Sequence, residues 1–233
     1  MIRENASASN SFFAALSRWE FKLSSFLQLS LTTFIALFPI VNPFGAVPFF
    51  LTISSESSKS TRKQTIVKSV IYVFFILVVF IVAGNLILNF FNISIPAIRI
   101  AGGLLLYRIG QNMLMARPKH ETTREEEYES QHKHDVSFTP LAMPMLSGPG
   151  SIAVALGLSD QVRAWSDYLA MTVSVVVICL LTYIILHAST FIARVMGYNG
   201  MNVMTRMMGF ITLCISVQFI VNGVLAIWRA NAL

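Results

Sequence analysis

Long apolar runs separated by short polar connections dominate this sequence. The runs cover residues 27–53, 67–90, 96–115, 138–158, 167–192 and 204–228. A helix needs about 20 mainly apolar residues to cross the hydrocarbon core of a bilayer. The pattern therefore predicts an all-α membrane protein with six transmembrane helices.

The six runs differ in their content of proline and glycine. The second and fifth contain the stretches 70–88 and 169–186, which are apolar, free of proline and predicted to form plain, continuous helices facing lipid. The first and fourth runs carry clusters of helix-breaking residues at their middles, namely Pro39, Pro43, Gly45 and Pro48 in one and Pro140, Pro144, Gly148, Pro149 and Gly150 in the other. Proline removes a backbone donor and glycine tolerates unusual dihedral angles. We therefore expect broken first and fourth helices.

Composition agrees with a lipid environment and limits what lies outside it. Hydrophobic residues make up 55% of the 233 residues and charged residues 12%, with a mean hydropathy of +0.67, which excludes an ordinary soluble domain. The strongly polar segment 117–136 is predicted to be a charged cytoplasmic loop between two units, 27–116 and 137–233. Residues 1–26 form an N-terminal extension, either an interfacial amphipathic helix or a frayed tail.

The net charge of +6 arises from basic residues beside the apolar runs. They do not form a patch with interleaved aromatic residues, so we expect no nucleic-acid partner. Most of those in connections follow the first, third and fifth runs: Lys59, Arg62, Lys63, Lys68, Arg117, Lys119, Arg124, Lys133 and Arg194. Because cytoplasmic loops carry the excess of Lys and Arg, this distribution predicts periplasmic N- and C-termini in a bacterial inner membrane.

An internal repeat relates the two units. Pro39, Asn42 and Gly45 recur 105 positions later as Pro144, Ser147 and Gly150. Independently, Arg99, Gly102 and Gln111 in the third run recur 107 positions later as Arg206, Gly209 and Gln218. Each unit holds three spans, an odd number, so the second must enter the membrane from the opposite side. The sequence thus predicts two inverted three-helix repeats, a construction typical of secondary transporters.

The matched breaks admit two interpretations. Backbone groups exposed by a break at membrane depth are tolerated only where they are buried in protein or line a wet cavity. The ends of half-helices there offer partial charges to a small solute. The alternative is that both breaks are kinks that permit tight helix packing. The recurrence of the cluster in corresponding spans favours a binding site.

Four motifs carry a family resemblance. FPIVNPFGAVPFF (38–50), ISIPAIRIAGG (93–103), PLAMPMLSGPGSIA (140–153) and RMMGF with VQFIVNG (206–223) together resemble the MarC family of bacterial inner-membrane proteins, named for a multiple-antibiotic-resistance locus. The resemblance covers nearly the whole chain from about residue 27. It implies a six-span protein grouped with neutral amino acid transporters and, more distantly, with LysE-type exporters.

The candidate binding residues are polar or backbone-exposing positions inside the runs. The side-chain candidates are Asn42, Ser147, Ser151, Gln111 and Gln218, and the backbone candidates are Pro43, Gly45, Gly148, Pro149 and Gly150. Arg99 and Arg206 lie near the starts of their spans, where each either snorkels to the interface or contacts a substrate carboxylate or a half-helix end. Gly102, Gly103 and Gly209 are expected to permit close helix approach, and Asn85, Asn89, Asn112 and Asn222 to link helices by hydrogen bonds.

The acidic residues lie in the connections or, as Asp167 does, at the very start of a span, which favours a small zwitterion over a di-cation as substrate. The expected function is a secondary transporter of small neutral amino acids such as alanine or glycine, working by alternating access. Transport or export of another small solute, a channel and a noncatalytic membrane protein remain alternatives. We expect no enzyme, because Ser151 lacks a G-x-S-x-G setting and no H-E-x-x-H motif occurs. We expect contacts with membrane lipid but no metal or cofactor. The identity of a coupling ion and the formation of a homo-oligomer are left open.

Overall fold

A computed structural model describes residues 25–55, 57–115 and 137–231, which are helical with short connections and contain no strand. The predicted N-terminal extension, except its last two residues, and the charged loop lie outside these ranges. The elements are a helix over residues 25–41, α2 (Pro43–Ile53), α3 (Lys59–Val82), α4 (Gly84–Phe90), α5 (Ile95–Met115), η1 (Ser137–Leu146), α7 (Pro149–Leu158), the 3₁₀ turn η2 (Ser159–Gln161), α8 (Trp165–His187) and α9 (Ser189–Asn231). The irregular segment η1 has π-type turns interrupted by extended backbone at Thr139 and Met143, and α9 is kinked at Gly197, which has a φ of 62°.

Several of these helices can cross a bilayer. Four are long and apolar enough, namely Ser25–Ile53, Lys59–Val82, Trp165–His187 and Asn199–Ala230. A fifth candidate is the pair α4 and α5, which is bent by 107° between its two helices, and α7 is apolar but shorter. The prediction of an all-α membrane protein is confirmed. The count of six spans stays a prediction, because length and composition identify four or five.

The predicted breaks in the first and fourth runs are present. The first run leaves helical geometry at Asn42, and the fourth is divided into η1 and α7. The second run, predicted to be continuous, is also broken: α3 ends at Val82 and α4 begins at Gly84. Gly84 packs against the Ser159 side chain, and Asn85 exchanges hydrogen bonds with Ser159. The break, which contains no proline, therefore coincides with a tertiary contact to Ser159. The fifth run forms the continuous helix α8, as predicted.

The apolar core lies among the helix over 25–41, α2, α3, η1, α7 and α8. Its fully buried side chains include Leu37, Val41, Val47, Phe50, Leu77, Ile81, Leu141, Leu146, Met171 and Ile178. Buried hydroxyls add polar links between helices. The Ser174 hydroxyl donates to the backbone oxygen of Ser30 at 2.6 Å, and the Ser69 hydroxyl donates to that of Ser137 at 2.8 Å. These bonds satisfy polar groups for which lipid offers no hydrogen-bond partner.

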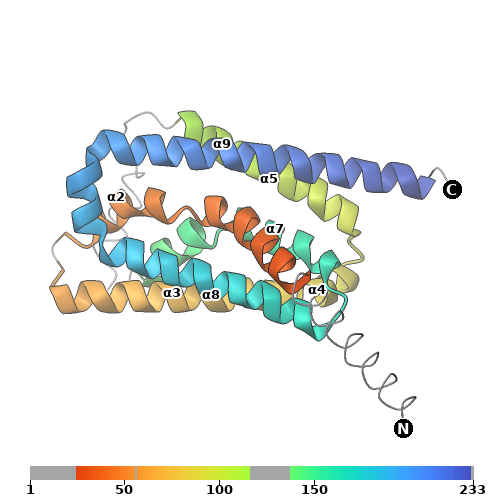
Figure 1. The fold of residues 1–233 in the computed structure, drawn as a ribbon, viewed down its shortest axis with the longest axis horizontal. Coiled ribbons are helices and arrows are strands. Elements are labelled where there is room, and N and C mark those ends of the chain that lie inside the picture. Colours follow the sequence, from red (N-terminus) through yellow and green to blue (C-terminus); the bar gives the residue numbers. More distant parts are fainter. Residues whose placement is uncertain (1–24, 56, 116–136, 232–233) are drawn as a thin grey trace, which may run out of the picture.

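Helices α5 and α9 form a pair along one edge of the molecule, and α3 and α8 lie together along the opposite edge (Figure 1). Glycines set the α5–α9 separation. A Cβ at Gly110 would lie 2.9 Å from the Gly209 carbonyl oxygen, and one at Gly103 would lie 2.9 Å from that of Ser216. Because Gly223 similarly faces Pro96, the two helices run antiparallel. The role predicted for Gly103 and Gly209 is confirmed. The same role is confirmed for Gly102, which permits close approach of α7, because a Cβ there would lie 3.0 Å from the Ala153 Cβ.

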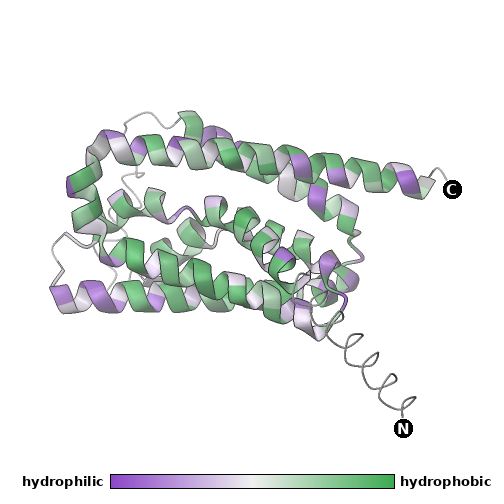
Figure 2. Ribbon diagram, viewed as in Figure 1, coloured by the Kyte–Doolittle hydropathy of each residue, from purple (hydrophilic) through white to green (hydrophobic). Residues whose placement is uncertain are grey.

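The outer surface suits lipid. Large apolar side chains are exposed on every long helix, including Leu31, Phe75, Leu104, Val176, Phe210 and Val224. Figure 2 shows apolar residues along the lengths of the helices and hydrophilic residues at the start of α3. Exposed apolar surface of this extent on long helices marks contact with a bilayer.

Candidate functional site

The first break is formed by Asn42 and Pro43. Asn42 adopts the left-handed conformation, with φ 45° and ψ 63°, and acts as the N-cap of α2. Its side-chain oxygen accepts a hydrogen bond from the Gly45 amide at 3.2 Å. Asparagine tolerates this backbone geometry better than most residues. Pro43 opens α2 and has no N–H, so the Pro39 carbonyl loses its helical hydrogen-bond donor.

The second break is built in a similar way. The Ser147 amide and hydroxyl both donate to the Ala142 carbonyl oxygen, at 2.8 and 2.9 Å, and so close η1. Gly148 is extended and is the N-cap of α7, which Pro149 opens. Proline at the first helical position suits a helix start, and its missing N–H leaves the Met145 carbonyl without a helical donor. Each break therefore frees a carbonyl and begins a new half-helix.

The two breaks lie close together inside the bundle. A Cβ at Gly150, in the first turn of α7, would lie 3.4 Å from the Ile40 side chain and 2.6 Å from that of Ile109 in α5. Ile40 precedes Asn42 by two residues. The helix before the first break therefore ends against the half-helix that follows the second break. Sequence spacing indicated two matched breaks, and their proximity is what the structure adds.

Packing around the breaks is tight. Val41, Pro43, Ser147, Gly150 and Ser151 are buried, whereas Asn42, Gly45 and Gly148 are half-buried and Pro149 is exposed. The Ser151 hydroxyl donates to the Gly148 carbonyl oxygen at 3.0 Å. Both serine hydroxyls thus donate to backbone within their own segments. They retain lone pairs that can accept hydrogen bonds.

Each of the two glutamines donates a hydrogen bond within its own helix. Gln111 is half-buried, and its side-chain nitrogen donates to the Tyr107 hydroxyl at 3.0 Å. Gln218 is exposed, and its side-chain nitrogen donates to the side-chain oxygen of Asn222 at 2.8 Å. Asn222 therefore bonds within α9 and not between helices, contrary to the sequence-based prediction. Asn85, through Ser159, does link helices as predicted.

The two arginines occupy different surroundings. Arg99 is half-buried at the start of α5. Its Cγ lies 3.8 Å from the position that a Cβ would occupy at Gly157. Gly157 is next to the last residue of α7. The aliphatic part of the Arg99 side chain therefore lies beside the end of α7, and the choice between its two predicted roles stays a prediction. Arg206 is exposed in α9, and its role stays a prediction.

One buried polar residue was not predicted. Thr33, in the helix before the first break, is fully buried, and its hydroxyl is the one buried side-chain polar atom without a hydrogen-bond partner in the part of the chain that the structure describes. A threonine in an apolar run ordinarily bonds to its own helix, as Thr182 does. No sequence signal distinguishes the two threonines.

The fold defines a helical integral membrane protein whose interior contains paired helix breaks. Comparison with known proteins gives the family. The model of "MarC family integral membrane protein" matches residues 27–228, and the chain belongs to the MarC family.

Curated relatives cover most of the chain. The chain is 39% identical to the membrane protein YvbG of Bacillus subtilis (strain 168), over 82% of this chain and 91% of that protein. It is 34% identical to a membrane protein of Aquifex aeolicus, over 86% of this chain and 94% of that protein. It is 35% identical to the inner membrane protein MarC of Escherichia coli O157:H7, over 84% of this chain and 94% of that protein. No solved structure matches the chain.

Proposed function

We propose that this protein is a secondary transporter of small neutral amino acids, of the alanine or glycine type, and that the two breaks hold the substrate. The observation that carries the proposal is that α7, a half-helix opened by Pro149, begins against the end of the helix that precedes the break at Asn42 and Pro43. Discontinuous helices of this kind supply ion and substrate sites in transporters. No catalytic step is part of the proposal.

The chemistry of the breaks suits a zwitterion. The first turns of α2 and α7 present partial positive charge from backbone amides, which would attract a carboxylate. The carbonyls of Pro39 and Met145 lack helical donors because of Pro43 and Pro149, so they can accept from an ammonium group. Asn42 and Gly45 are half-buried, and the proposal places them in contact with the substrate.

Charge inside the bundle also favours a net-neutral substrate. Asp167 is the one acidic residue within the spans that the structure describes, and it lies in the first turn of α8. There its carboxylate accepts from the Arg163 and Ala164 amides at 2.7 and 2.9 Å. It therefore serves as a cap at the edge of the bundle, and a carboxylate that would balance a di-cation is absent from the described core.

The proposal includes two inverted three-helix repeats that move relative to each other in alternating access. The matched breaks and the antiparallel α5 and α9, which come from corresponding positions in the two units, support this organisation. The relative from Escherichia coli is named an inner membrane protein. We extend that location to this chain, with both termini in the periplasm as the distribution of basic residues predicts.

Counterflow of radiolabelled alanine and glycine into proteoliposomes tests the proposal. The decisive variant is Asn42→Asp, because aspartate retains the oxygen that caps α2 while placing a negative charge where the substrate carboxylate would bind. The matched control is Asn89→Asp, the same change at an exposed position at the end of α4.

We expect saturable counterflow by the native protein and the Asn89→Asp variant, with a strong loss in Asn42→Asp. Absence of saturable counterflow with the folded native protein for any neutral amino acid would reject the substrate class. Unchanged KM and maximal rate in Asn42→Asp would reject the site. Large, unsaturable flux would show a channel in place of a carrier.

A further inference from the structure

A cavity of about 230 Å³ lies at one end of the bundle, away from the helix breaks. Four elements meet there: the end of α2, the first turns of α3, the end of α8 and the beginning of α9. Its lining residues are Phe50, Lys59, Arg62, Lys63, Ile66, Leu186, His187, Ser189 and Thr190. One water molecule takes up roughly 30 Å³ in the liquid, so the cavity has room for a small anionic group with its hydration.

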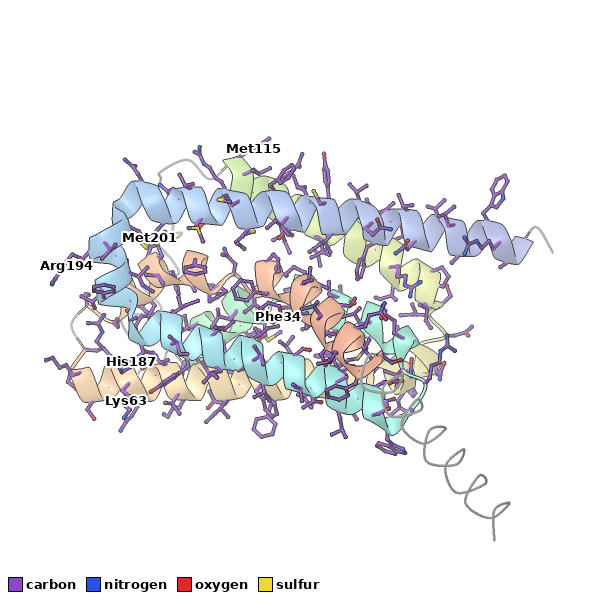
Figure 3. All side chains as sticks on the ribbon, in the orientation of Figure 1. Phe34, Lys63, Met115, His187, Arg194 and Met201 are labelled. Carbon is purple, nitrogen blue, oxygen red and sulfur yellow. The ribbon has the colours of Figure 1, made fainter. Side chains whose placement is uncertain are left out.

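The wall of this cavity is strongly basic. Lys59, Arg62 and Lys63 occupy the first two turns of α3, and His187 ends α8. In Figure 3, Lys63 and His187 lie at the same end of the molecule. No acidic residue is among the lining residues, and the first turn of α3 contains none. The nearest acidic residue in the sequence, Glu56, lies outside the described residues.

Backbone charge adds to that of the side chains. Ser58 caps α3 by accepting from the Thr61 amide at 3.2 Å, and Lys59, the first residue of α3, lines the cavity, so the helix begins there. The partial positive charge of a helix N-terminus favours anions. Ser189 and Thr190 bring the beginning of α9, a second helix start, to the same cavity.

The floor of the cavity is apolar and buried. Phe50, Ile66 and Leu186 are each at least 97% buried. The Arg62 guanidinium carbon lies 5.6 Å from the centre of the Phe50 ring, a cation–π distance, which orients the guanidinium over the floor. Arginine held in this way presents a planar set of donors that matches phosphate oxygens.

The cavity also lies at the level expected of lipid headgroups. Lys59, Arg62 and Lys63 precede the apolar part of α3, in which Thr65, Ile66 and Ser69 are the first buried residues. Exposed apolar residues follow, including Val67, Ile71 and Phe75. Basic pockets between membrane helices at this depth suit anionic headgroups.

We propose that this cavity binds a phosphate-class anion through Lys59, Arg62, Lys63 and the two helix starts. The anion is the headgroup phosphate of an anionic phospholipid or free inorganic phosphate. This site is separate from the paired breaks, so it does not depend on the proposed transport function.

The test uses the full-length protein in a neutral detergent. Its thermal midpoint is measured with added phosphatidylglycerol, phosphatidylcholine, or inorganic phosphate at matched ionic strength, and bound lipid is counted by native mass spectrometry. The variants are Lys59→Gln with Lys63→Gln, and separately Arg62→Gln. Arg194→Gln is the control, because Arg194 is exposed at the same end (Figure 3) but does not line the cavity.

Phosphatidylglycerol is expected to stabilise the native protein while phosphatidylcholine does not. Each removed cation should weaken the apparent affinity roughly fivefold, and the Arg194→Gln control should bind as the native protein does. Stabilisation by inorganic phosphate, with no further gain from phosphatidylglycerol, would support the free anion as the ligand. Lack of stabilisation by either probe, or equal weakening in the Arg194→Gln control, would overturn the proposal.

Discussion

The contact between α5 and α9 allows a quantitative prediction about two glycines. A Cβ added at Gly110 would lie 2.9 Å from the Gly209 carbonyl oxygen and 3.0 Å from the Leu213 amide nitrogen. A Cβ added at Gly209 would lie 3.0 Å from the Gly110 carbonyl oxygen and 2.7 Å from Met113 Cβ. Backbone atoms cannot rotate away, so either methyl group must push the helices apart.

The expected cost follows from two opposing terms. Overpacking a tight contact costs about 1–3 kcal/mol, and backbone neighbours place Gly110→Ala in the upper part of that range. Alanine recovers about 1 kcal/mol of helix propensity relative to glycine. Each single variant should therefore lose about 1–2 kcal/mol of unfolding free energy. The double variant should lose clearly less than the sum, because one methyl group already separates the backbones that the second would separate.

The measurement is an SDS titration of the detergent-solubilised protein followed by circular dichroism, in a double-mutant cycle. Ala101→Val is the control, since Ala101 is exposed on α5 and should change stability by about 0.5 kcal/mol or less. Strict additivity of the two glycine variants, or a gain of stability in both single variants, would refute the glycine-mediated contact.

Two further predictions concern the first break and the thiols. Asn42→Ala should destabilise the protein by about 1 kcal/mol, because it removes the cap on Gly45 and places alanine in a left-handed conformation. Asn42→Asp should change the thermal midpoint little. Equal thermal midpoints for the two variants would argue against the capped geometry. A small lipophilic maleimide should label the exposed Cys214 in detergent much faster than the buried Cys179. Mass spectrometry follows the labelling of each cysteine. Equal labelling rates would contradict the packing of α8.

The sequence predicted the helices best where a single physical cause determined them. Apolar length identified α8, and proline chemistry located the breaks at Asn42 and before Pro149. Helix geometry depends on local residues at these points, because a missing N–H acts within one turn. Proline positions did not locate the break between Val82 and Gly84, which contains no proline and lies at a contact with Ser159, far away in the sequence.

The candidate site was predicted only in part for a related reason. The repeat identified the residue types that recur, including Gln111 and Gln218, but periodicity alone does not say which face of a helix meets the breaks. In the structure, Gln218 lies on the exposed face of α9. The basic cavity was missed because Lys59 and His187 are distant in the sequence and come together only when α3 packs against α8.

Pro43 and Pro149 have a consequence for any rearrangement of this bundle. A continuous helix through either residue would cost roughly 3 kcal/mol, since the ring displaces the carbonyl four residues earlier. Each proline therefore favours a break at its own position when neighbouring helices shift, although Pro48 shows that a proline can also lie inside a helix of this bundle. The segments on either side of a break can change their angle while the residue that divides them stays the same.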